Sequence, residues 1–324
     1  MKAIIPIAGK GTRTYPLSFA NPKPLLRIKG KPILYYVTKV LKKFKVKEVI
    51  YVISPNMLEF IEDIKKIGGF KSDYVIQEIP YGLGDAILCV EKKIKKGNCV
   101  IVLGDTILDV NLKNFNKNKN YIGVYEVPDP RRFGVVLLEN DIIVGVEEKP
   151  EKPKTNLIIC GIYYISEIER LFSALREIKK KDIKTKGEYQ LTDALQFLLK
   201  KRENFYPLKV KKWFDTGTLE DIFETHKKLL NKSQVSKNSI IKNTKIIPPV
   251  WIDSGVKVEN SEIGPFVSIE KESEIKNSKI KNGIIYKGVK IINCEIEKGI
   301  IGDYSEIKNL KVKEIFVTNK SKIV

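Results

Sequence analysis

The stretch that decides the fold is Ala3–Leu26, AIIPIAGKGTRTYPLSFANPKPLL, in which a short apolar run leads directly into a basic loop. Residues 3–7 predict a strand that is apolar on both faces, which is typical of a parallel sheet covered by helices. Gly9 and Gly11 then free the backbone for a tight turn whose N–H groups can face an anion. We therefore expect an α/β fold with an anion-binding loop after its first strand.

The side chains of this loop suit phosphate oxygens. Thr12 offers a hydroxyl, Arg13 a planar guanidinium that can bridge two oxygens, and Lys23 a compact ammonium. The spacing matches neither the Walker motif nor the dinucleotide fingerprint, because Thr14 stands where the fingerprint needs its third glycine. The loop thus predicts a nucleoside triphosphate held in another way, and the alternative is a glycine turn with solvated basic residues.

Composition limits the function classes. The chain has 324 residues, of which 43% are hydrophobic and 30% charged, so we expect two domains with an ordinary core. The net charge of +20 raises nucleic acid or acidic membranes as partners, but the lysines are spread in short groups along the chain and favour solvated helix faces instead. The four cysteines form no C-x-x-C pair, and no apolar run reaches the ~18 residues of a membrane span. We expect a cytoplasmic protein that binds neither membrane nor nucleic acid.

Up to about Lys232 the sequence alternates between strand and helix patterns, which predicts a Rossmann-like mixed sheet. Ligands of such sheets gather at the carboxyl ends of the strands. Gln77 and Asp105 each come at the end of an expected strand, so we expect both beside the glycine loop. Residues 121–165 are richer in strand patterns and suggest a lid or insertion.

Beyond Ser236 aliphatic residues recur every five or six positions, as in Ile269, Ile275 and Ile280. This interval predicts a left-handed parallel β-helix, with a β-sandwich as the alternative. We therefore place a catalytic domain at residues 1–232 and the β-helix at 233–324. The β-helix is expected to stabilise the protein or to assemble it into a homo-oligomer.

Two acidic residues are placed to bind a divalent cation. Asp105 follows a buried strand through Leu103-Gly104, and Asp215 lies in the segment WFDTGT. Hard carboxylate oxygens suit Mg²⁺, which keeps several waters in protein sites.

Several motifs in chain order resemble those of the sugar-phosphate nucleotidylyltransferases, in particular the glucose-1-phosphate thymidylyl- and uridylyltransferases. They are G-x-G-T-R and P-K-x-L in the first loop, then L-G-D, E-E-K-P and D-T-G at 103–105, 147–150 and 215–217. The resemblance covers residues 1–232 and implies transfer of a nucleotidyl group from dTTP or UTP to a hexose 1-phosphate such as glucose 1-phosphate. It also implies a requirement for Mg²⁺.

The same resemblance implies roles for individual residues. Arg13 would hold the triphosphate and Lys23 the α-phosphate, while Gln77 and Gly82 would read a pyrimidine base. We expect catalytic roles for Arg13, Lys23, Asp105 and Asp215, with both aspartates as metal ligands. The expected nucleotide-binding residues are Ala8, Gly9, Gly11, Thr12, Arg13, Lys23, Gln77, Gly82 and Asp105. The expected sugar-phosphate-binding residues are Thr106, Gly134, Glu148, Lys149, Gly161 and Lys186.

Some alternatives stay open. The short form of the loop, AGKGTR, leaves the base undecided, so guanylyl or adenylyl transfer remains possible. A non-catalytic scaffold resembling the translation-factor exchange subunits would have the same two-domain plan. Some relatives acetylate sugars with a histidine of the β-helix, but the sole histidine, His226, precedes the β-helix on an expected helix. We expect it at a surface or interface and expect no acetyl transfer of that kind.

Overall fold

A computed structural model describes all 324 residues of the chain. The chain forms two compact units, and each is built from two separate segments. Unit 1 comprises Met1–Lys10 and Leu34–Phe214, and unit 2 comprises Gly11–Ile33 and Asp215–Val324. The loop that follows the first strand therefore belongs to the same unit as the C-terminal residues. The division in chain order into 1–232 and 233–324 stays a prediction.

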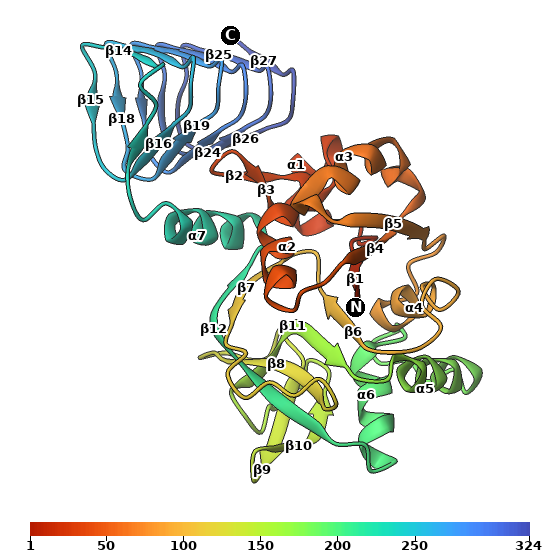
Figure 1. The fold of residues 1–324 in the computed structure, drawn as a ribbon. Helices are drawn as coiled ribbons and strands as arrows, with labels where there is room; N and C mark the ends of the chain where they lie inside the picture. Colours follow the sequence, from red (N-terminus) through yellow and green to blue (C-terminus); the bar gives the residue numbers. More distant parts are fainter. The chain divides into compact units, whose positions relative to one another are not determined.

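Unit 1 contains a ten-stranded mixed sheet (Figure 1). Its strands are β1 (Lys2–Pro6), β4 (Glu48–Ile53), β5 (Lys71–Ile76), β6 (Cys99–Val102), β7 (Thr106–Val110), β8 (Asn120–Glu126), β9 (Val135–Glu139), β10 (Ile142–Glu147), β11 (Leu157–Ile165) and β12 (Phe205–Asp215). The order is β5-β4-β1-β6-β11-β8-β12-β10-β9, and β7 pairs with β12. β5, β4, β1 and β6 are parallel, whereas β11 is antiparallel to both β6 and β8. The predicted Rossmann-like mixed sheet is confirmed.

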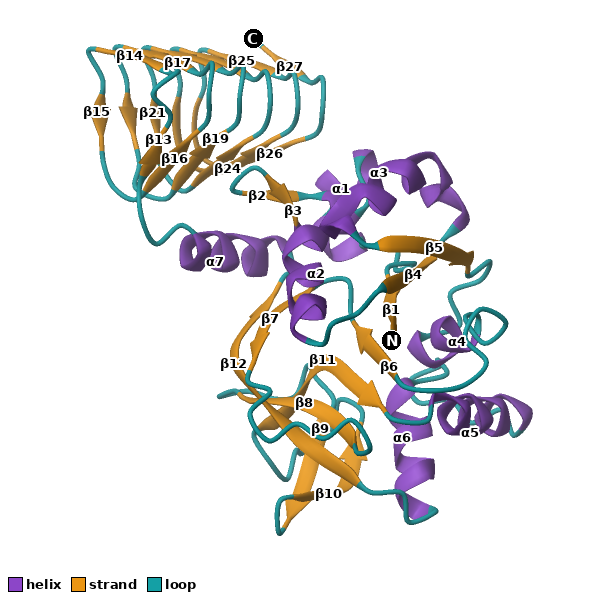
Figure 2. Ribbon diagram, viewed as in Figure 1, coloured by secondary structure: helices purple, strands orange, loops and turns teal.

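The helices of unit 1 cover this sheet (Figure 2). They are α2 (Ile33–Lys43), α3 (Ile61–Lys66), α4 (Leu83–Leu88), α5 (Ile168–Lys180) and α6 (Leu191–Lys200). α4, α5 and α6 pack against one another, and their apolar residues share one buried core with β1, β4, β6, β8 and β11. None of the helices is both long and apolar enough to cross a membrane.

Residues 121–165, expected to form a lid or insertion, do not form a separate lid, because their strands belong to the large sheet. β8 and β11 are interior strands of the large sheet, and β11 is buried along almost its whole length. Its residues Leu157–Ile165 are apolar on both faces, as a central strand requires, so the chain continues the sheet in the antiparallel direction.

Unit 2 is dominated by stacked short parallel strands that form a β-helix, as predicted (Figure 1). Successive coils align isoleucine with isoleucine, as in Ile252↔Ile269 and Ile285↔Ile301, and these side chains form a continuous buried core. The strands are β13 (Gln234–Val235), β14 (Ile240–Lys242), β15 (Lys245–Ile246), β16 (Val250–Ile252), β17 (Lys257–Glu259), β18 (Glu262–Ile263), β19 (Val267–Ile269), β20 (Glu274–Lys276), β21 (Lys279–Ile280), β22 (Gly283–Ile285), β23 (Lys290–Ile292), β24 (Glu295–Ile301), β25 (Glu306–Lys308), β26 (Lys311–Val317) and β27 (Lys322–Ile323).

The other elements of unit 2 come from the first loop and from the segment before the β-helix. They are α1 (Leu17–Ala20), β2 (Arg27–Ile28), β3 (Lys31–Pro32) and α7 (Leu219–Leu229). α7 starts with a capping box in which Thr218 and Asp221 satisfy each other's backbone N–H groups. The prediction that His226 lies at a surface or interface was wrong, because this α7 side chain is fully buried. α7 is amphipathic, and His226 lies on its buried face together with Ile222 and Phe223.

Candidate functional site

Gln77 directly follows the parallel strand β5 and is buried with only 5% of its surface exposed. Its side-chain nitrogen Nε2 donates to the Gly82 carbonyl at 3.1 Å and to Asp85 Oδ2 at 2.9 Å. Both bonds use the amide nitrogen, so the carbonyl oxygen Oε1 remains as the acceptor. The strand end thus presents a hydrogen-bond acceptor of fixed orientation.

Asp85 fixes this orientation. It lies in the first turn of α4, is 6% exposed, and accepts a salt bridge from Lys179 of α5 at 2.7 Å through its other oxygen. The hydrogen bond that Lys179 donates to Asp85 raises the pKa of Lys179, as expected for a cation paired with a carboxylate. Reversing the Gln77 amide would turn Oε1 toward the Gly82 carbonyl and Asp85 Oδ2, which are both acceptors. The Asp85 carboxylate therefore holds the Gln77 amide in one orientation. Sequence reasoning missed both residues, because no local pattern joins Asp85 to Lys179.

Gly82 links this site to the turn that carries Lys186. It caps α4 with φ 120°, and a Cβ there would lie 2.7 Å from the Tyr189 carbonyl oxygen. Tyr189 in turn donates its N–H to the Tyr81 carbonyl at 2.8 Å. Lys186 is exposed at the tip of the turn Thr185–Glu188, with φ 55°. Only glycine suits the close approach at position 82.

A second group of predicted residues gathers around Glu148. Glu148 Oε2 accepts from the Thr192 hydroxyl at 3.0 Å, and its other oxygen pairs with Lys149 at 3.3 Å. A Cβ at Gly134 would lie 3.3 Å from Glu148 Oε2, and the Lys149 N–H donates to the Phe133 carbonyl at 3.2 Å. The structure therefore brings Gly134, Glu148 and Lys149 together, as the sugar-phosphate prediction requires.

Asp193 joins the two groups. Its Oδ1 accepts from the Thr185 hydroxyl at 2.9 Å, next to Lys186, while Oδ2 is buried without a hydrogen-bond partner. Burial, together with the nearby charge of Glu148, raises the pKa of Asp193. Asp193 was missed because LTD looks like an ordinary helix start.

Thr106 and Gly161 also lie together. Thr106 is the buried first residue of β7, and a Cβ on Gly161 would lie 2.9 Å from its hydroxyl oxygen. Gly161 also accepts the Leu103 N–H at 2.9 Å, which fixes the backbone before Asp105. Asp105 itself is partly exposed between β6 and β7. Ala8 is buried and Gly9 exposed after β1, in which Ala3, Ile4 and Ile5 are buried as predicted.

The remaining predicted residues belong to unit 2. Gly11 has φ 63°, and its carbonyl accepts from the hydroxyls of Thr14 and Ser18, both at 2.7 Å. These bonds close the turn in which Thr12 and Arg13 are exposed. Lys23 starts a 3₁₀ turn with Pro24 and Leu25 and is partly exposed.

Asp215 ends β12, and its Oδ1 accepts the Gly217 N–H at 3.0 Å in a local turn. The Thr225 hydroxyl of α7 donates to the Asp215 carbonyl at 2.8 Å, so helix and turn fix the residue together. No group of three or more His, Cys, Asp or Glu side chains in the chain could hold a metal ion. Asp105 and Asp215 match the donors that Mg²⁺ takes from proteins, which are one or two carboxylates besides substrate phosphates and waters.

Comparison with known proteins also indicates a nucleotidyltransferase. The nucleotidyl transferase family matches residues 2–232. The chain is 25% identical to glucose-1-phosphate thymidylyltransferase of Streptomyces griseus, over 95% of this chain and 93% of that protein. It is 35% identical to the bifunctional protein GlmU of Methanocaldococcus jannaschii, over 76% of this chain but only 60% of that protein.

A solved structure of UDP-glucose pyrophosphorylase complexed with UDP-glucose superposes with a TM-score of 0.59 at 26% identity, covering 70% of this chain and 97% of that one. The resemblance to sugar-phosphate nucleotidylyltransferases is thereby confirmed. Since the family match extends over most of the sequence, the chain belongs to the nucleotidyl transferase family.

Proposed function

We propose that the chain transfers a uridylyl or thymidylyl group from UTP or dTTP to a hexose 1-phosphate, with glucose 1-phosphate as the preferred acceptor. An oxygen of the sugar phosphate attacks the α-phosphorus of the nucleotide, the bond from that phosphorus to the β-phosphate oxygen breaks, and pyrophosphate leaves. The relatives support transfer to a sugar phosphate, but they differ in substrate.

The orientation of Gln77 favours bases with a ring N–H donor, which are uracil, thymine and guanine, over adenine and cytosine. Uracil and thymine present an N3–H donor at the edge that pairs in nucleic acids, whereas cytosine and adenine present a ring-nitrogen acceptor at the equivalent position. The carbonyl oxygen of Gln77 can accept from the N3–H of uracil or thymine. It would repel the ring nitrogen of cytosine or adenine, because both atoms are acceptors. This supports uridylyl or thymidylyl transfer over adenylyl transfer.

The remaining roles follow from charge. We propose that Arg13 bridges oxygens of the leaving diphosphate and that Lys23 neutralises charge on the α-phosphate, because a planar guanidinium suits two phosphate oxygens and a compact ammonium suits one. Asp105 and Asp215 would hold Mg²⁺, which when bound supplies a Lewis acid for the phosphate oxygens. Divalent metal is a general requirement in this family.

Glu148 and Lys149 are proposed to bind the acceptor. Thr192 and Lys149 hold the Glu148 carboxylate from opposite oxygens, so the carboxylate can accept from sugar hydroxyls without turning. The Lys149 ammonium is exposed and suits the sugar phosphate. Lys186, on the turn fixed by Asp193, would add a second cation for it.

The direct test is pyrophosphate release with each common nucleoside triphosphate and a panel of hexose 1-phosphates. We expect turnover with UTP or dTTP and glucose 1-phosphate that stops with EDTA and returns with Mg²⁺. Asp105→Asn should abolish turnover without changing the fold, as judged by circular dichroism. No turnover with any pair, from folded protein with metal present, would refute the enzyme and favour the scaffold alternative.

Acetyl transfer of the histidine-dependent kind is not proposed. Both ring nitrogens of His226 are buried without hydrogen-bond partners, so neither is available to a substrate. Acetylation of glucosamine 1-phosphate by acetyl-CoA in the presence of the protein would contradict this.

A further inference from the structure

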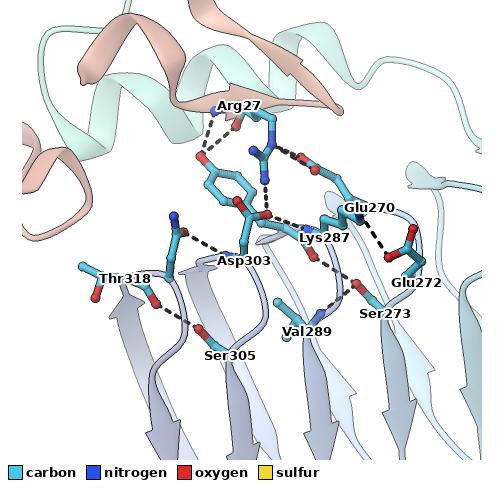
Figure 3. A network of polar contacts seen from close by, with 11 residues as sticks. Arg27, Glu270, Glu272, Ser273, Lys287, Val289, Asp303, Ser305 and Thr318 are labelled. Atoms are coloured by element: carbon cyan, nitrogen blue, oxygen red, sulfur yellow. Dashed lines mark hydrogen bonds and ion pairs between the residues drawn. The ribbon is translucent and has the colours of Figure 1, made fainter. Parts of the chain in front are cut away.

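Arg27 of the first loop is held by two carboxylates and an aromatic ring of the β-helix (Figure 3). Its Nε donates to Glu270 at 2.9 Å, its Nη2 donates to Asp303, and the guanidinium carbon lies 4.3 Å from the centre of the Tyr286 ring. The backbone is held too, because the Arg27 N–H donates to the Tyr286 hydroxyl at 2.8 Å and that hydroxyl donates to the Arg27 carbonyl at 3.2 Å. We call Arg27, Glu270, Tyr286 and Asp303 the Arg27 clamp.

The β-helix is built to receive this cation. Glu270 and Tyr286 come from consecutive coils and are only 7% and 2% exposed. Asp303, from the next coil, is held by the Lys287 N–H at 3.0 Å and receives Arg27 with the same oxygen (Figure 3). Without Arg27 two carboxylates would face each other in a largely dry site, and a buried charge that has lost its partner is strongly destabilising. The clamp therefore requires the first loop to lie in one place.

A short, tightly packed path joins the clamp to the phosphate-binding residues. The Leu26 N–H donates to the Lys23 carbonyl at 3.1 Å, and Leu26 is 1% exposed, so the residues from Lys23 to Leu26 form a tight turn directly before Arg27. At the other end, a Cβ on Gly11 would lie 3.4 Å from the Lys23 Cβ. Lys23 thus lies between Arg27 and the turn that carries Arg13, and we expect movement at Arg27 to reach both.

The same β-helix also holds the helix that follows Asp215. Lys298 of β24 pairs with Glu220 at 2.5 Å and with Glu314 at 3.0 Å. The rings of Phe223 in α7 and Phe316 in β26 lie 6.0 Å apart. α7 in turn bonds Asp215 through Thr225, so the aspartate is fixed from the same scaffold.

We propose that the β-helix is a positioning scaffold for the reaction, in which the Arg27 clamp fixes Lys23 and the Gly11–Arg13 turn for attack at the α-phosphorus. Arg27 and Tyr286 are positioning residues, since they act on the nucleotide through Lys23 and Arg13. The inference rests on the proposed nucleotidyl transfer and goes beyond the stabilising or assembling role expected for the β-helix.

Tyr286→Phe tests the clamp with the smallest change, because it removes only the hydroxyl that holds both backbone groups of Arg27. The matched control is Tyr304→Phe, at an exposed tyrosine of the next coil. We expect Tyr286→Phe to raise amide hydrogen exchange in residues 11–26 about tenfold or more without substrate, and to lower kcat about tenfold or more. The KM for the sugar phosphate should stay within about twofold, and the control should change neither quantity.

A second pair of variants guards against misfolding. Arg27→Lys keeps a cation and should retain more kcat than Arg27→Ala, whereas a purely structural role would give variants whose kcat per folded molecule equals that of the wild type. Unchanged exchange in residues 11–26, or raised exchange with unchanged kcat, would overturn the proposal. If the wild type shows no nucleotidyl transfer the proposed function fails, while the exchange measurement still tests the clamp.

Discussion

Asp85→Asn tests how the protein chooses its base. In the wild type, Gln77 Nε2 donates to a carboxylate at 2.9 Å and to a carbonyl at 3.1 Å. A hydrogen bond to a charged partner contributes about 1.5–3 kcal/mol, and reversing the amide would forfeit it and oppose two acceptors. With a neutral amide at position 85, which can donate as well as accept, this preference is lost.

Since each 1.4 kcal/mol corresponds to about a tenfold ratio, we expect the preference for UTP over CTP, as the ratio of kcat/KM values, to fall roughly 10- to 100-fold. Pyrophosphate release at a fixed glucose 1-phosphate concentration measures both values. Asp73→Asn is the matched control, because Asp73 pairs with Lys93 at 2.5 Å near the start of β5. It should leave the ratio unchanged.

Lys179→Met separates the orientation of the Gln77 amide from a general loss of protein stability. This variant removes the cation but leaves the carboxylate that accepts from Gln77, so the UTP preference should stay within about threefold even though the protein loses stability. An Asp85→Asn protein that folds and keeps the full wild-type preference would refute the reasoning. So would a Lys179→Met protein that loses the preference as completely as Asp85→Asn.

Three further changes address stability. Burial raises the pKa of Glu270 to about 7 despite the opposing effect of Arg27, so the folded state holds a proton that the unfolded state releases above pH 4.5. Stability should therefore fall by about 3 kcal/mol between pH 4.5 and 7, and denaturant unfolding of Glu270→Gln should lack this fall. Burial lowers the pKa of His226 to about 4. The stability that comes from burying the neutral ring is therefore present above pH 6.5 and is lost as the pH falls toward 4. His226→Leu should remove about 3 kcal/mol of acid destabilisation, and an unaltered acid limb of the unfolding curve would count against it. Gly82→Ala would set a Cβ against the Tyr189 carbonyl at φ 120°, so it should lower the free energy of unfolding by about 1–3 kcal/mol. A thermal melt identical to that of the wild type would contradict the strain at this position.

The sequence was sufficient wherever a local pattern sets the structure. The aliphatic repeat around Ile269 and Ile285 predicted the β-helix because each coil must bury one side chain per face. The apolar run before Gly9 predicted a parallel strand, and β1 pairs in parallel with β4 and β6. The structure also brings Glu148 and Lys149 of the E-E-K-P motif together with Gly134, while their binding of the sugar phosphate stays a prediction.

What the sequence could not predict depends on partners far apart in the chain. Arg27 meets Glu270 across 243 residues, and each looks like an ordinary charged surface residue by itself. Asp85 meets Lys179 across 94 residues, so no motif joins them. The burial of His226 depends on which face of α7 packs inward, and that face is set by contacts that a local pattern does not show.

The Arg27 clamp is better explained by geometry than by stability. Burying an Arg with two carboxylates costs desolvation that the ion pairs only partly offset, and well-packed apolar side chains often stabilise a protein at least as well. The raised pKa of Glu270 is a sign of that cost. An apolar contact, however, would tolerate sliding of β2 along the β-helix, whereas the hydroxyl of Tyr286 and the oppositely placed Glu270 and Asp303 accept the guanidinium and its backbone in one pose. A loop that must present Arg13 and Lys23 to a reacting phosphate needs that single pose, because positional error in a catalytic group lowers the rate more than a modest loss of stability does.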